Sequence, residues 1–95
     1  MLRFRLHPEA EREALSAVEW IKDEDPIQSD LFVAALKNAI GRARSNPEVY
    51  PKFSGEFRKV RVGKFTYAVV FRLRRDEIQI VAVMPHHRKP GYWKK

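Results

Sequence analysis

The chain has 95 residues, of which 44% are hydrophobic and 33% are charged. This length suits one compact domain over residues 1–95, and the composition suits a folded protein better than a disordered chain. No stretch approaches the roughly 20 apolar residues of a membrane-spanning helix, so we expect no membrane partner. The N-terminus lacks the apolar core of a signal peptide and the chain has no cysteine. Both features favour a cytoplasmic protein without disulfides or thiol chemistry.

The formal net charge of +7 is concentrated in the second half of the chain. Residues 1–47 hold 7 basic and 8 acidic side chains, whereas residues 48–95 hold 12 basic and 4 acidic side chains, a net of +8. Such a field attracts an anionic partner, which could be nucleic acid, an acidic protein segment or an anionic lipid surface. Charge alone does not choose among these partners.

The first half predicts a strand followed by two helices. Leu2, Phe4 and Leu6 alternate with arginines, which predicts a short strand with one buried face. Pro8 predicts a helix start, and that helix should run to about residue 23. A second helix is predicted over residues 29–45, with Ser29 or Asp30 as its cap. The short connection between them predicts an antiparallel helical hairpin.

The apolar positions of both helices recur every three or four residues, as expected of helices that lie on a sheet. Those positions are Ala10, Ala14, Leu15, Val18, Ile21, Phe32, Ala35, Leu36, Ala39, Ile40 and Ala43. Trp20 is interpreted as part of the core or of the packing between the helices.

The second half predicts a loop over residues 50–55 and then three strands, over residues 57–62, 65–73 and 77–84. Short turns join the strands, so we expect an antiparallel meander. On the long strand, Phe65, Tyr67, Val69, Phe71 and Leu73 share one face. On the last strand, Ile78, Ile80, Ala82 and Met84 form the main apolar set. The predicted fold class is therefore α+β, with the order β-α-α-β-β-β.

Several segments in this order resemble the ParE/RelE toxins of type II toxin-antitoxin systems. They are Pro8-Glu9-Ala10, Asn46-Pro47, Arg58-Lys59-Val60, the strands over residues 65–72 and 78–83, and the ending over residues 86–93. The chain departs from many family members at Thr66, Pro85 and His87. The Pro90-Gly91-Tyr92-Trp93 ending favours the ParE-like subgroup.

The resemblance implies a cytoplasmic toxin that forms a hetero-oligomer with a cognate acidic antitoxin and needs no cofactor. A ParE-like member would inhibit DNA gyrase, without being an enzyme itself. The alternative is a RelE-like, metal-independent endoribonuclease that acts on mRNA at the ribosome. A plain nucleic-acid-binding module, suggested by the basic half alone, is a third hypothesis.

A nuclease needs a base, an acid and cations around one phosphate. The candidate catalytic residues are Arg58, His86, His87, Arg88 and Tyr92. The competing interpretation is that the two histidines and Arg88 form a solvated polar segment after the last strand. A metal site built on His7, His86 and His87 is disfavoured, because adjacent residues of an extended segment point to opposite sides.

The candidate partner-binding residues are the basic and aromatic side chains of the second half. They are Lys52, Arg58, Arg61, Arg72, Arg88, Tyr92 and Trp93. Arg58 and Arg72 share strand faces with apolar residues, so each should have an anionic partner: an internal acid, the antitoxin or a phosphate. Trp93 could stack on a partner or pack back on the sheet. Arg61, Arg74 and Arg75 are interpreted as solvated charges.

Overall fold

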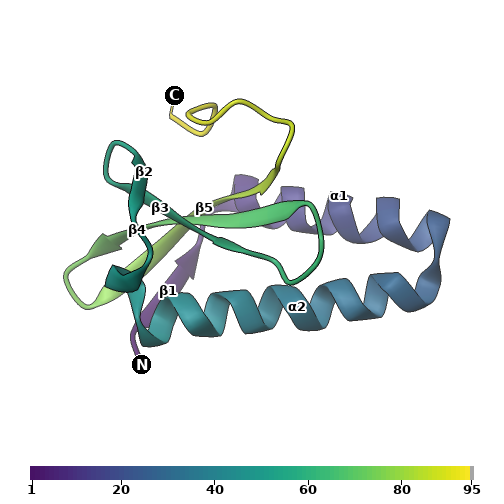
Figure 1. Ribbon diagram of the computed structural model, residues 1–95, viewed down its shortest axis with the longest axis horizontal. Helices are drawn as coiled ribbons and strands as arrows, with labels where there is room; N and C mark the ends of the chain where they lie inside the picture. Colours follow the sequence, from purple (N-terminus) through teal and green to yellow (C-terminus); the bar gives the residue numbers. More distant parts are fainter. Residues whose placement is uncertain (95) are drawn as a thin grey trace.

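The computed structural model describes residues 1–94 and has one five-stranded sheet with two helices on one face. In chain order the elements are β1 (Arg3–Leu6), α1 (Pro8–Glu24), α2 (Pro26–Ser45), the 3-10 helix η1 (Pro47–Val49), β2 (Lys52–Ser54), β3 (Phe57–Arg61), β4 (Tyr67–Arg74) and β5 (Glu77–Pro85). The strand order is β1-β5-β4-β3-β2, with β1 parallel to β5 and the other pairs antiparallel. Figure 1 shows α1 and α2 side by side, with the C-terminal segment across the sheet from α2. The predicted α+β class is confirmed, and the predicted elements occur in the expected order, with one additional short strand, β2.

A single residue, Asp25, joins the two helices. Its backbone N–H donates to the Ile21 carbonyl at 2.8 Å, which ends α1, and its side chain accepts from the Ile27 N–H at 3.0 Å, which caps α2. Pro26 fits the first position of a helix, where no N–H is needed. The predicted start of α2 near Ser29 was therefore wrong. Ser29 lies buried inside the helix and caps nothing.

The main core lies between the helices and the sheet. It contains the apolar positions predicted for α2 and most of those predicted for α1. Phe4, predicted on the buried face of β1, is 42% exposed. On α1 two predictions failed, because Leu15 is 60% exposed and Trp20 is 67% exposed. The pitch of α1 explains both results. The stripe through Ala10, Val18 and Ile21 faces the sheet and α2, whereas Leu15 and Trp20 lie on either side of this stripe.

The face pattern of β4 agrees with the prediction, but that of β5 does not. Val70 pairs with Ala82 while Phe71 pairs with Ile80, so Val81 is an extra residue that forms a β-bulge. A bulge reverses the alternation of side chains along a strand. Ile80 therefore faces the helices, as predicted, whereas Ala82 and Met84 belong to a second cluster on the other face of the sheet.

The predicted loop over residues 50–55 contains the extra strand β2, in which Lys52 pairs with Arg58 of β3. The second apolar cluster lies over this region and comprises Phe57, Val70, Ala82 and Met84, with Phe53, Val81, Tyr92 and Trp93 packed against it. Within residues 1–94, no helix is both long and apolar enough to cross a membrane.

Candidate partner-binding surface

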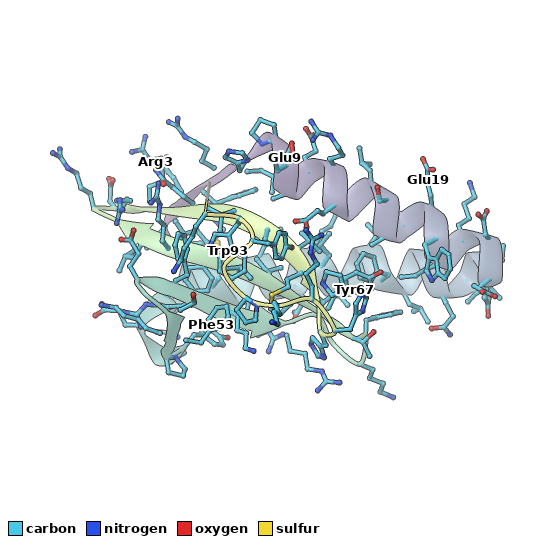
Figure 2. The ribbon with its side chains drawn as sticks, turned by 90° about the horizontal axis from the view of Figure 1, so that it is seen from above. Arg3, Glu9, Glu19, Phe53, Tyr67 and Trp93 are labelled. Atoms are coloured by element: carbon cyan, nitrogen blue, oxygen red, sulfur yellow. The ribbon has the colours of Figure 1, made fainter. Side chains whose placement is uncertain are left out.

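The C-terminal residues 86–94, called here the strap, fold over the second face of the sheet. Its Trp93 ring packs on Phe53 and Phe57, with ring centroids 5.8 and 5.5 Å away, and on Tyr92 at 5.3 Å. Figure 2 shows Trp93 lying over the strands beside Phe53. These four side chains form the aromatic cluster. The prediction that Trp93 packs back on the sheet is confirmed.

Tyr92 is fixed by a carboxylate from the other end of the chain. Glu13 of α1 accepts a hydrogen bond from the Tyr92 hydroxyl and another from the Val83 N–H, the latter at 2.9 Å. Burial and the bond to Glu13 raise the pKa of Tyr92 above its usual value, so the hydroxyl keeps its proton and remains a donor. The Arg88 guanidinium stacks 3.9 Å from the centroid of the Tyr92 ring.

Arg72 has an internal anionic partner. Its guanidinium donates to Gln79 at 2.8 Å and to Glu56 at 3.2 Å, and it lies 5.7 Å from the Phe57 ring centroid. Glu56 also accepts from Arg74, and chiefly this hydrogen bond lowers the pKa of Glu56 to about 2. Arg74 is exposed, as the interpretation of a solvated charge expects, and it also forms an ion pair with Glu56. Of the three anionic partners expected for Arg72, the structure contains the internal acid, which is Glu56.

Arg58 is bound by the backbone instead of by an acid. Its guanidinium donates to the carbonyl oxygen of Tyr50 at 2.7 Å. The Nε atom of Arg58 is buried and has no hydrogen-bond acceptor within residues 1–94. The Tyr50 ring packs on Phe71 of the main core, so Arg58 lies toward the helix side of the sheet. The strap lies on the opposite face.

The candidate nuclease residues are therefore divided. Arg88 and Tyr92 are in contact, whereas Arg58 lies across the sheet from them. His86 and His87 are exposed in the turn after β5. The folded chain brings together two of the five candidates.

Four exposed cations lie on β2, on β3 and in the turn after β3. Lys59 lies 4.7 Å from the Phe53 ring centroid, and the Arg61 carbonyl accepts from Arg42 at 3.0 Å. The basic rim is defined as the four exposed cations Lys52, Lys59, Arg61 and Lys64. Within residues 1–94, no carboxylate lies within ion-pairing distance of a rim side chain. The rim is thus one part of the basic half that is open to an anionic partner, as are the exposed Arg75, Arg88 and Lys89.

Two hollows of about 420 and 480 Å³ lie between α1 and the ends of β4 and β5, and they share Trp20, Tyr67 and Pro85. A third hollow of about 770 Å³ lies under the strap, and Glu13 and Arg88 line both it and the first. Neither Trp20 nor Glu13 was predicted from the sequence as a site residue. The helical spacing could have identified Glu13, because this acid lies on the same face of α1 as the buried Ala10 and Ala17.

Comparisons with known proteins agree with this architecture. A sequence-family model described as "ParE toxin of type II toxin-antitoxin system, parDE" matches residues 4–90. A solved structure described as "Chromosomal ParDE TA system from P. aeruginosa" contains a chain with a similar fold. The TM-score is 0.67 at 14% identity, over 90% of this chain and 96% of that one. No curated protein sequence matches the chain significantly.

The family match covers nearly the whole chain and includes both the helical hairpin and the sheet. It places the protein among the toxins of type II toxin-antitoxin systems. Within that class, the chain belongs to the ParE toxin family. The resemblance seen in the sequence, and its ParE-like assignment, are confirmed.

Proposed function

We propose that this ParE-family toxin arrests growth by inhibiting DNA gyrase, and that a cognate acidic antitoxin neutralises it in a cytoplasmic hetero-oligomer. The observation that supports binding over RNA cleavage is the division of the candidate nuclease residues between two faces of the sheet. Cleavage by a 2′-hydroxyl requires a base, an acid and a cation around one phosphate. Inhibition of a target enzyme requires only a complementary surface.

The basic rim supports an acidic antitoxin segment as the partner. Lys59 and Arg61 alternate along β3, so they point to the same side of the strand. Their exposure without internal carboxylates leaves two cations for an acidic chain that lies across this side of β3. Opposite charges of this kind speed encounter and select the correct partner.

Co-expression with the cognate antitoxin tests neutralisation. Expression of the toxin alone should arrest growth, and the antitoxin should relieve the arrest. The charge reversals Lys59→Glu and Arg61→Glu should weaken the relief, whereas Lys22→Glu and Lys37→Glu, on the helices, should leave it unchanged. Relief that survives the rim reversals would remove the rim from the antitoxin interface.

RelE-like cleavage of mRNA is the alternative, and the contact between Arg88 and Tyr92 is the observation in its favour. Mapping transcript 5′ ends after induction distinguishes the two functions. Inhibition of gyrase predicts no new ends within translated codons during the first minutes of growth arrest. New ends inside codons that disappear in Arg88→Ala would establish the nuclease and contradict our proposal.

A further inference from the structure

Three predicted partner-binding residues lie in the strap, and two of them are partly covered by the strap's own packing on the sheet. Trp93 is enclosed in the aromatic cluster, and the Tyr92 hydroxyl is engaged by Glu13. Only Arg88 is exposed. Both rings are only partly exposed. Contact between a partner and their covered faces therefore requires the strap to move away from the sheet.

Few polar contacts hold the strap in place. Its backbone bonds to the body at His86, whose N–H donates to Thr66 at 2.9 Å. Beyond that residue, the bonds at Arg88 and Lys94 close local turns, to Pro85 and Gly91. Within residues 1–94, one side-chain hydrogen bond joins the strap to the rest of the protein, and it runs from the Tyr92 hydroxyl to Glu13.

The remaining contacts of the strap are apolar packing and a cation–π contact, and one buried polar atom of the strap has no partner. The indole Nε1 of Trp93 is buried and has no acceptor within residues 1–94. A buried donor without an acceptor disfavours the closed position, because the N–H regains a partner when it meets water. The aromatic packing and the Tyr92 bond must outweigh this cost.

The strap also contains a bend on which it can turn. Gly91 has a φ of 98°, which favours glycine, and it follows Pro90. Residues 86–90 are exposed throughout. The anchored part of the strap is therefore short, comprising Tyr92, Trp93 and Lys94, and Lys94 lies 5.5 Å from the Phe57 ring centroid.

We propose that the strap opens as a unit and that Glu13 is the latch that holds it closed. Opening exposes Trp93 and uncovers the second apolar face of the sheet, built on Phe57, Val70 and Met84. Glu13 also lines the hollow beside Trp20, so a partner seated there reaches the latch directly. The latch thereby regulates access to the partner-binding residues of the proposed function, although its geometry does not depend on the identity of the target.

Exchange of the Trp93 indole proton measures opening directly. Trp20→Phe leaves Trp93 as the only tryptophan, so a single indole N–H signal appears in the NMR spectrum of the full chain. In that background, Tyr92→Phe removes the bond to the strap while the bond between Glu13 and Val83 remains. Loss of a hydrogen bond to a charged group should raise the exchange rate about tenfold or more.

Two further variants complete the experiment. Glu13→Ala should accelerate exchange at least as much as Tyr92→Phe, and the double variant should add little, because both changes remove one interaction. Glu19→Ala, on the same helix with its side chain pointing into solvent, should have no effect (Figure 2). An unchanged rate in Tyr92→Phe would overturn the latch, even if Glu13→Ala failed to fold.

The test separates the latch from the proposed function. A faster rate in Tyr92→Phe establishes the latch whether or not the toxin inhibits gyrase. An unchanged rate leaves gyrase inhibition intact and shows that aromatic packing alone holds the strap.

Discussion

Phe32 of α2 packs edge-to-face on Phe65, with ring centroids 5.1 Å apart and planes at 88°. Phe32 is fully buried at the centre of the main core, where it also meets Tyr67. Phe32→Ala should lower the free energy of unfolding by about 3–5 kcal/mol, because it removes buried surface and leaves a cavity. Denaturant unfolding measures the change. Phe4→Ala, at a ring that is 42% exposed, should cost clearly less, and equal losses would contradict the assigned core.

The ion pairs of Glu56 predict a stability that depends on pH. The pKa of this carboxyl falls from 4.5 to about 2 in the folded protein, chiefly through the hydrogen bond with Arg74. The folded state then binds fewer protons than the unfolded state between these values. The contribution of Glu56 is therefore present above the unfolded pKa and is lost as the pH falls from about 5 to about 2.

Unfolding of the wild type and Glu56→Gln over this pH range checks the effect. The variant should be less stable near neutrality, and the difference should shrink toward pH 2. The difference should be modest, because exposed pairs are screened by solvent. A difference that stays constant with pH would show that Glu56 acts through packing instead of charge.

The shared cap at Asp25 gives a third prediction. Asp25→Ala removes the acceptor for the Ile27 N–H and should destabilise the protein by about 0.5–2 kcal/mol. Asp30→Ala changes an exposed acid of the same helix and should shift stability by less than about 0.5 kcal/mol. Denaturation midpoints distinguish them, and a larger loss in Asp30→Ala would restore the cap expected from the sequence.

The periodic parts of the fold could be predicted because a buried face imposes a repeat on the sequence. The stripe of α2 and the alternation from Phe65 through β4 to Leu73 both follow from such a repeat. The bulge at Val81 could not be predicted in this way. Residues 80–84 are apolar or small on both faces, so the sequence carries no polar residue to mark where the alternation reverses.

The candidate surface was less predictable, because it depends on contacts between distant segments. Arg72 could be recognised as needing an anion, but the identity of Glu56 depends on the turn between β2 and β3. Glu13 and Tyr92 are 79 positions apart, and only the folded sheet brings them together. Arg58 was expected to meet an internal acid, the antitoxin or a phosphate, and within residues 1–94 its side chain meets backbone carbonyls and no acid.

DNA supercoiling by purified gyrase tests the central proposal most directly. Relaxed plasmid, gyrase and ATP are incubated with increasing amounts of the purified toxin, and the topoisomers are separated on a gel. The proposal predicts that supercoiling falls as toxin is added and returns when the cognate antitoxin is supplied in equal amount. Supercoiling that continues unchanged at saturating toxin would contradict inhibition of gyrase.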